Sequence, residues 1–273
     1  MIGASSSNFT NKSVRSLNTS LKELSNTFAK LASGMRINKA SDDAAGLAVA
    51  SSLSTSARLD GQAMRNVGDA QSALAIADGA VTQIQDMSSR RAELAMQAAN
   101  GTYSDEQRAV MQAEFDQLGQ EIQRTAETTE FNGTKLLNGE SISVQVGSDG
   151  SAGSSLSVGG LTVASTFASG GSLNISTQAG AQAALTSVQN FSQAINTQRT
   201  QSIGAAQSRL SSVESTLSTS REAKLGAYSR ITDADIASES ANLVMQDIRA
   251  KGGVAVLAQS KNISALAVSM LLG

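Results

Sequence analysis

One stretch of the sequence, residues 14–35, reads VRSLNTSLKELSNTFAKLASGM. Its apolar residues recur at alternating intervals of three and four, which is the spacing of a coiled-coil seam and not of a β-strand. These seam residues are Val14, Leu17, Leu21, Leu24, Phe28, Leu31 and Met35. The spacing predicts a helix over about residues 12 to 36 that packs against a partner helix through one apolar stripe.

The same spacing returns in four later parts of the chain, most clearly from Val67 to Ile84 and from Ile203 to Leu217. It predicts further helices over about 42 to 99, 104 to 129, 181 to 229 and 232 to 271. Near the C-terminus the repeat is carried by Ile263, Leu266 and Met270. Helices of this length predict a mainly α fold, a long-helix coiled-coil rod whose terminal helices pair, with about twice the usual helix content.

Residues that favour helix ends lie where the spacing predicts them. Ser41, followed by Asp42 and Asp43, is the expected N-cap of the second helix, and its two carboxylates would lie near the positive end of the helix dipole. Asn100-Gly101 is the expected stop. Two further helix starts are expected at Ser104 with Gln107, a capping box, and at Thr232 with Asp235. Capping therefore accounts for these acidic residues without a cation site.

The middle of the chain, from Glu140 to Thr177, is rich in Gly and Ser. Its apolar residues alternate, which predicts short strands. They are Ile142, Val144 and Val146, then Leu156 and Val158, then Leu161 and Val163. Gly159-Gly160 is the expected two-residue hairpin turn. We expect a small β-hairpin region that buries at most one face and adds little to the core.

The composition excludes several classes of function. The chain has no Cys and no His, so it can form neither a Ser-His-Asp or Cys-His triad nor a zinc, haem or disulfide site of the usual kind. We therefore expect no enzyme activity, no cofactor and no metal. The 21 basic and 23 acidic residues are scattered, which predicts no nucleic-acid partner. The absence of a long apolar run predicts no membrane span, and the polar N-terminus predicts no cleaved signal peptide.

Three stretches of this sequence resemble signatures of the bacterial flagellin family, in the family's order. Residues 31–50, LASGMRINKASDDAAGLAVA, resemble its N-terminal signature. Residues 93–104, continuing to 131–137, resemble its second helix pair and closing turn, and residues 229–239, SRITDADIASE, resemble its C-terminal signature. The resemblance covers about residues 1 to 140 and 180 to 273, so the chain resembles a short flagellin without large outer domains.

The resemblance implies a division into domains. Residues 1–40 and 231–273 would form the two halves of an inner core domain, and residues 41–140 and 179–230 the helices of a rod domain. Residues 141–178 would form the β-hairpin region between them. Inside the last predicted helix, Gly252-Gly253 is unusual, because an interior glycine costs about 1 kcal/mol relative to alanine.

The resemblance also implies a function, a structural subunit that polymerises into the filament for swimming motility. The terminal seams could form a coiled coil within one chain or be buried only against neighbouring subunits. The family favours the second reading, which makes subunit contacts of Val14, Leu17, Leu21, Leu24, Phe28, Leu31, Ile263, Leu266 and Met270. The alternative function is a hook-filament junction protein, although that family usually has Pro after the paired acids, where this chain has Ala44.

Partners and location also follow from the resemblance. The expected partners are further flagellin subunits, hook-associated proteins, filament cap proteins and an export chaperone. Arg90, Leu94 and Glu114 match the positions at which the family contacts an innate immune receptor. The protein would be secreted through type III export to the extracellular filament. An enzymatic flagellin with a peptidase insert is excluded, since the chain has no His-containing metal motif.

Overall fold

The structure is a computed structural model that describes residues 2–147, 151–168 and 173–272. Side chains are described in the same ranges except at residues 2–9, 152, 168, 261 and 263–272. The chain forms two compact units, residues 1–55 with 223–273 and residues 56–222. We call them the terminal unit and the central unit. The fold is mainly α, with long helices and short strands, as predicted.

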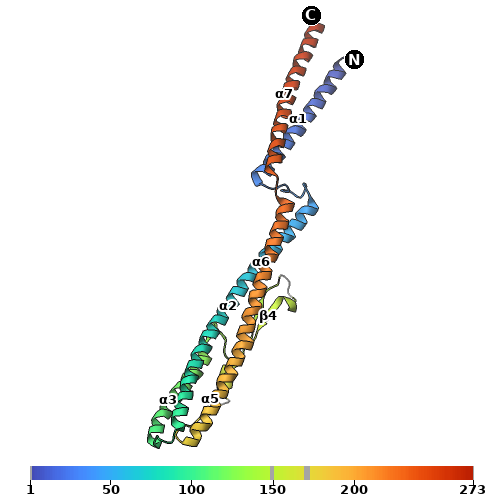
Figure 1. Cartoon of the computed structure of the whole chain (residues 1–273). Helices are drawn as coiled ribbons and strands as arrows, with labels where there is room; N and C mark the ends of the chain where they lie inside the picture. The colour runs from blue at the N-terminus through green and yellow to red at the C-terminus, as the bar shows by residue number, and fades with distance from the viewer. Residues whose placement is uncertain (1, 148–150, 169–172, 273) are drawn as a thin grey trace. The chain divides into compact units, whose positions relative to one another are not determined.

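The terminal unit is built on two long helices, α1 (Ile2–Ser33) and α7 (Ile236–Leu272). They lie side by side and antiparallel, with both chain ends at the same end of the pair (Figure 1). Helix α1 begins at Ile2 and not near residue 12 as expected. The segment before residue 12 has few apolar residues, so the spacing signal is lost there, although no proline interrupts the helix.

Backbone hydrogen bonds join the two connecting segments of the terminal unit. Met35 and Asp233 form an isolated antiparallel bridge, and the Arg36 N–H donates to the Thr232 carbonyl at 2.6 Å. The Ala234 N–H donates to the carbonyl of Gly34 at 2.9 Å, and Gly34 has a φ of 68° that favours glycine. The two terminal signatures, far apart in sequence, are therefore held together by their backbones.

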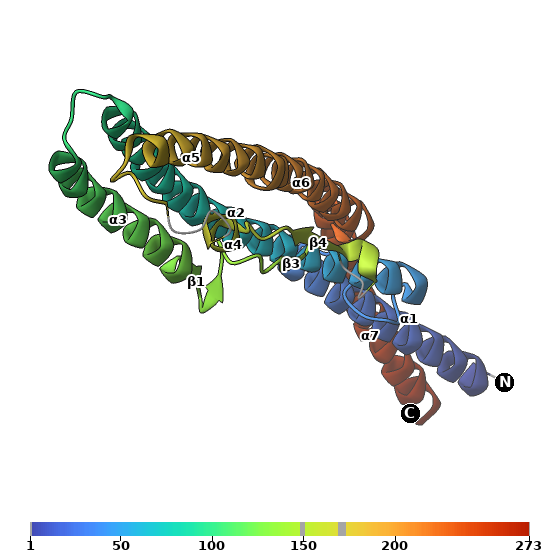
Figure 2. The same ribbon diagram turned by 90° about the horizontal axis from the view of Figure 1, so that it is seen from below.

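The central unit is organised around α2 (Ala44–Ala99), which begins in the terminal unit. Helices α3 (Asp105–Thr128), α5 (Gln178–Gln198) and α6 (Ala205–Thr232) lie along it, as Figure 2 shows. One apolar cluster contains residues from all of these helices, including the fully buried Ile84, Ile122, Ile195 and Leu210. The apolar stripes predicted for these helices therefore meet in the core, most of them in this cluster, whereas Phe115 of α3 belongs to a second, smaller apolar cluster.

The long C-terminal rod helix is interrupted, whereas the sequence analysis expected it to be continuous over 181 to 229. A π-helical turn, η2 (Arg199–Gly204), joins α5 to α6. Buried Val188 and Ile195 are seven residues apart, but the next buried seam residue, Ile203, follows after eight. A π-turn holds about one residue more than an α-turn, so it absorbs the additional residue and keeps the seam on one face.

The strands form two small antiparallel hairpins. Strands β1 (Glu130–Phe131) and β2 (Thr134–Lys135) are joined by Asn132-Gly133, both at positive φ, 50° and 82°. Strands β3 (Ile142–Gln145) and β4 (Ser155–Val158) pair with Ile142 opposite Val158, and the 3-10 turn η1 (Ala152–Ser154) precedes β4.

The predicted hairpin turn at Gly159-Gly160 is wrong. Leu161 is not in a strand, and Val163 begins the short helix α4 (Val163–Ala168), which lies between α3 and α5. A Cβ atom at Gly160 would lie 1.9 Å from the Glu140 carbonyl oxygen, so this glycine permits a close approach of two backbone segments. Nor is this region peripheral, because Leu156, Val158, Leu161 and Val163 are buried in the main core cluster.

Two of the predicted helix caps are also corrected. Helix α2 begins one residue after Asp43, whose Oδ1 accepts from the Gly46 N–H at 2.8 Å, so Asp43 and not Ser41 is its cap. The Thr232 hydroxyl donates to the Tyr228 carbonyl at the end of α6, and Asp235 caps α7. The capping box of Ser104 and Gln107 is confirmed, and α2 ends at Ala99, directly before the predicted stop.

Candidate functional site

The helices α1 and α7 meet along a seam that differs from the one predicted. Along α1, seven positions that are not exposed follow the expected three-four spacing, but four of these seven are small polar residues. We call this set the inner seam; it contains Thr10, Ser13, Leu17, Ser20, Leu24, Thr27 and Leu31 on α1, and Leu243, Gln246, Ala250, Gly253, Leu257 and Ser260 on α7. Four of its seven positions on α1 therefore bury little apolar surface.

Few polar contacts cross the inner seam. Thr10 and Ser260 share a hydrogen bond between their hydroxyl oxygens at 3.2 Å. Lys30 lies 4.0 Å from Glu239, the limit of an ion pair. The side-chain oxygen of Gln246 is buried without a hydrogen-bond partner among the described residues. An unsatisfied buried acceptor weakens the pairing, so we expect the contact between α1 and α7 to be marginal on its own.

The two consecutive glycines of α7 face in different directions. A Cβ atom at Gly253 would lie 3.4 Å from Cδ1 and 4.0 Å from Cα of Leu17, so the backbones of α1 and α7 approach closely there. A Cβ atom at Gly252 would meet nothing within 4 Å. Gly253 therefore has a packing role, whereas Gly252 is simply an exposed helix position.

A second apolar stripe of α1 remains exposed. Its members are Val14, Leu21 and Phe28, which are spaced by seven residues and are 40%, 46% and 65% exposed. We call these three residues the outer stripe. Helix α7 also exposes large apolar side chains, at Val244, Met245, Ile248, Val254 and Val256. Large apolar patches on a soluble protein mark contact surfaces, and this one covers both helices of the pair.

The predicted seam residues thus divide into two groups. Leu17, Leu24 and Leu31 are half-buried in the inner seam, against α7. The other three predicted residues of α1 form the outer stripe. Ile263, Leu266 and Met270 lie in α7, but outside the residues whose side chains are described.

An apolar groove connects the outer stripe to the inner seam. It has a volume of about 420 Å³ and is lined by Leu21, Leu24, Ser25, Phe28, Leu243, Val244 and Asp247. Its one carboxylate, on Asp247, pairs with Lys251 at 2.6 Å. Such a groove can bind apolar side chains, but its lining residues include no group of polar side chains placed to catalyse a reaction.

The three residues predicted to contact an immune receptor are not all on the surface. Arg90 on α2 bonds to Glu114 on α3 at 2.9 Å and to Glu93 at 3.1 Å. The hydrogen bond to Glu114 raises the pKa of Arg90 above its usual range. Leu94 is only 2% exposed and belongs to the core, beneath the surface that Arg90 and Glu114 share.

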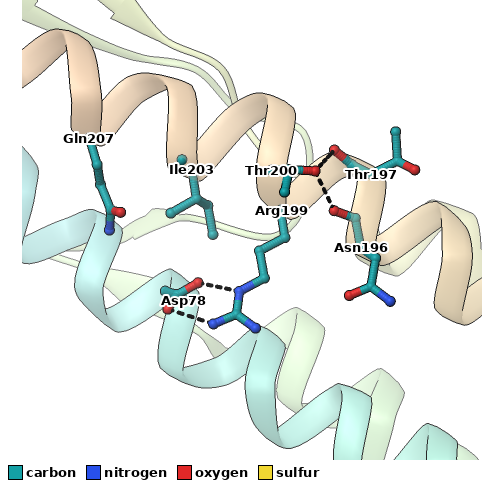
Figure 3. A pocket seen from close by; sticks show the side chains of 8 residues that line it. Asp78, Asn196, Thr197, Arg199, Thr200, Ile203 and Gln207 are labelled. Carbon is teal, nitrogen blue, oxygen red and sulfur yellow. Dashed lines mark hydrogen bonds and ion pairs between the residues drawn. The ribbon is translucent and has the colours of Figure 1, made fainter.

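Figure 3 shows a larger pocket beside the π-turn of the central unit, with a volume of about 560 Å³. Arg199 donates from Nε to Asp78 Oδ1 at 2.6 Å and from Nη2 to Oδ2 at 2.8 Å. This bond raises the pKa of Arg199. The sequence analysis missed this pair, although the eight-residue step from Ile195 to Ile203 marks the turn that carries it.

Two other features, a metal-binding cluster and a membrane-spanning helix, are absent from the described parts of the chain. No cluster of three or more acidic residues is placed to hold a metal ion there. None of the described helices combines the length and the apolar character needed to cross a membrane.

Comparison with known proteins identifies the family that this chain resembles. Residues 5–141 match the family described as the bacterial flagellin N-terminal helical region, and residues 185–271 match the bacterial flagellin C-terminal helical region. A flagellin of Halalkalibacterium halodurans is 32% identical over 248 residues, which are 90% of this chain and 91% of that protein. Flagellin FlaB2 of Treponema pallidum is 32% identical over 258 residues, 89% of this chain and 90% of that protein.

Two solved structures are similar in fold. The crystal structure of Bacillus cereus flagellin matches with a TM-score of 0.50 and 28% identity, covering 56% of this chain and 88% of that one. A putative flagellar hook-associated protein from Vibrio parahaemolyticus matches with a TM-score of 0.59, covering 70% of this chain and all of that one. The identity of the second is 14%, so it is evidence for the fold alone.

Proposed function

This chain belongs to the bacterial flagellin family, and we propose that it joins its neighbours in the filament through the outer stripe of its terminal unit. As a flagellin it is a structural subunit of the bacterial flagellar filament, an extracellular part of the flagellum. Its length, close to that of the relatives, fits a short form without a large outer domain.

The observation that carries the proposal is the exposure of Val14, Leu21 and Phe28 on a helix whose neighbouring stripe is already covered by α7. Burying a Leu or Phe side chain fully contributes about 1.5–3 kcal/mol, and in a helical polymer every subunit repeats the gain. The half-polar inner seam supports the same proposal, because neighbours would then supply most of the stability of these helices.

We propose domain boundaries that separate the helices in contact with neighbouring subunits from the rest of the chain. Residues 1–40 and 231–273 would form the inner core of the filament, and residues 41–140 and 179–230 the rod domain, with 141–178 as its β-hairpin region. In the same reading the C-terminal seam of Ile263, Leu266 and Met270 would complete the subunit contact. Type III export without a cleaved signal peptide would bring the chain to the filament.

The other partners are proposed from the family alone. They are an export chaperone, the filament cap, the hook-associated proteins and an innate immune receptor. For the receptor, Arg90 and Glu114 are the accessible candidates, whereas Leu94 would support their helices from below. We assign no enzymatic role, because the flagellin family is one of structural proteins.

The alternative, a hook-filament junction protein, is tested together with the proposal by seeded polymerisation. Purified protein mixed with short filament fragments should grow into long filaments, and a junction protein should only cap the fragments.

Leu21→Asp should abolish growth, because an unpaired carboxylate in an apolar contact is strongly disfavoured. Asn26→Asp is the matched control, since Asn26 is exposed and lies about 160° around α1 from Phe28. Long filaments from Leu21→Asp would refute the proposed contact.

A further inference from the structure

Arg91, in the central unit, is a buried cation with an unsatisfied donor. The residue is 6% exposed, and its Nε–H group has no hydrogen-bond partner among the described residues. Its neighbour Arg90 is exposed and bonds to Glu93 and Glu114. The two consecutive arginines of α2 therefore have opposite environments, and only Arg91 lacks a bonded carboxylate.

Two aromatic rings account for part of the burial of Arg91. Its Cζ lies 4.0 Å from the ring centroid of Phe115 and 5.2 Å from that of Phe167. Attraction to a ring face acts on the flat face of the guanidinium, whereas the N–H donors lie in its plane. Asp116 acts on Arg91 only by charge, and burial lowers the pKa of Arg91 to about 10, so the group stays charged at neutral pH.

Gly119 of α3 leaves room for the guanidinium of Arg91. A Cβ atom at Gly119 would lie 3.4 Å from Nη2 of Arg91 and 3.5 Å from Cζ of Phe167. A glycine inside a helix costs about 1 kcal/mol relative to alanine, and at this position any side chain longer than that of alanine would meet the guanidinium or the ring. The glycine at position 119 of α3 therefore accommodates the guanidinium of Arg91 beside it.

A small cavity adjoins Arg91, at the boundary of the two apolar clusters. Its volume is about 30 Å³, and its wall includes Thr166 and Phe167 of α4 and Ser187 and Phe191 of α5. That is room for a single small ion or one or two waters, and too little for an organic cofactor. The rings of Phe167 and Phe191, which both line the cavity, pack edge to face with centroids 5.4 Å apart.

The charges around the cavity favour an anion over water. Among the described residues that line it, Arg91 is the only charged one. The hydroxyl of Ser187 donates to the Ala183 carbonyl and that of Thr166 to the Thr162 carbonyl, so neither offers a hydrogen to an anion and the Nε–H group of Arg91 is the donor that would hold it. A water would satisfy the Nε–H group but add no charge, which leaves Asp116, a carboxylate without a bond to Arg91, as the compensating group, whereas an anion would satisfy the donor and place a negative charge directly on the guanidinium.

We propose that this cavity binds a small monovalent anion, such as chloride, held by the Nε–H group of Arg91. The anion would connect α2 to α4 and α5 and stabilise the central unit. The residues of the site all lie in the central unit, so binding can be measured on the monomer.

Thermal unfolding of the full-length monomer, followed by circular dichroism, provides the test. The comparison is between sodium chloride and sodium gluconate at equal ionic strength, because gluconate is too large for the cavity. A ligand that binds only the folded state raises Tm with its concentration, so 200 mM chloride should raise Tm by about 3 °C over gluconate. Arg91→Met should lose this difference, and Arg90→Met, the matched control, should keep it.

Equal melting temperatures of the wild-type protein in the two salts would overturn the proposal, as would a chloride effect of the same size in Arg91→Met. If Arg91→Met does not fold, the ³⁵Cl line width of sodium chloride solutions replaces it. The wild-type protein and Arg90→Met should broaden the chloride line, and bromide should reverse the broadening. A line that is no broader than in buffer would equally overturn the proposal and leave water as the occupant.

Discussion

Arg199 and Asp78 form a two-pronged ion pair, with bonds of 2.6 and 2.8 Å, across the helices of the central unit. Arg199 is the first residue of the π-turn, and Asp78 lies on α2. The pair therefore holds the irregular turn against the longest helix of the protein. Because both side chains are 33% exposed, the pair is worth less than a buried one.

Asp78→Asn should weaken this link modestly. The amide keeps one acceptor but loses the charge and the two-pronged geometry, so we expect a loss of about 1 kcal/mol and a fall in Tm of about 2–4 °C. Asp69→Asn, at an exposed position of the same helix, is the control and should melt within 1 °C of wild type, about the error of such a scan. Equal Tm values for the two variants, by circular dichroism, would contradict the role given to the pair.

Deleting Gln201 from the π-turn should be tolerated. The deletion restores a seven-residue step between the seam positions now held by Ile195 and Ile203, so a regular α-helix can replace the π-turn. Deleting Ser212, in the regular part of α6, should instead turn Val213 and Leu217 away from the core and cost more than about 3 kcal/mol. Urea unfolding measures both. Similar losses from the two deletions would show that the π-turn does not absorb an additional residue.

Ser104→Ala should destabilise α3 and change a titration. The Ser104 hydroxyl accepts from the Gln107 N–H, and losing such a cap costs about 1 kcal/mol. Hydrogen bonds from the Glu106 backbone N–H and from Ser104 hold the pKa of Glu106 below 4.5, so the variant should raise that pKa. NMR titration of the carboxyl carbon measures it, and an unchanged pKa would contradict the assignment.

The lowered pKa of Glu106 fixes the direction in which the free energy of unfolding changes with pH. In the unfolded state this carboxyl binds its proton at a higher pH than in the folded state, so its contribution is present above pH 4.5 and is lost as pH falls through the folded pKa. The stability difference between wild type and Ser104→Ala should therefore be smaller at pH 3 than at pH 7. A difference that grows on acidification would have the wrong sign.

The two glycines of α7 should respond in opposite ways. Gly252→Ala adds helix propensity in open space and should raise the temperature at which filaments dissociate, by an amount equivalent to about 1 kcal/mol per subunit. Gly253→Leu should lower it, since the side chain would meet Leu17 and separate α1 from α7. Light scattering of heated filaments measures both. A stabilising Gly253→Leu would mean that the two backbones do not approach at this position.

The sequence predicts the seven-residue repeat of α1, but it does not predict which face of α1 contacts α7. Leu17, Leu24 and Leu31 belong to two neighbouring stripes, and the apolar signal favours the stripe that contains Val14 and Phe28. The stripe that α7 covers contains Thr27, which is buried, and serines, which carry no apolar signal. Small residues allow two helices to approach closely. Helix α7 therefore packs against the inner seam of α1, whereas hydrophobicity alone predicted the outer stripe as the contact face.

The central region shows a different limit of sequence reasoning. Gly160 resembles a turn residue, but only the fold brings Glu140 against it. Likewise, nothing local to Arg91 distinguishes it from Arg90, and its burial depends on Phe115 of α3 and Phe167 of α4. Contacts between distant segments fix these environments, so a local pattern cannot predict them.

The central claim, that neighbouring subunits cover the outer stripe, is tested most directly by thiol labelling. Because the chain has no Cys, Phe28→Cys places a single thiol in the stripe, and Asn26→Cys places one on the opposite side of α1 as a reference. We predict that a maleimide labels Phe28→Cys rapidly in the monomer and at least tenfold more slowly in filaments grown from it, with greater protection than at Asn26→Cys. Equal labelling rates of Phe28→Cys in monomer and filament would contradict the claim.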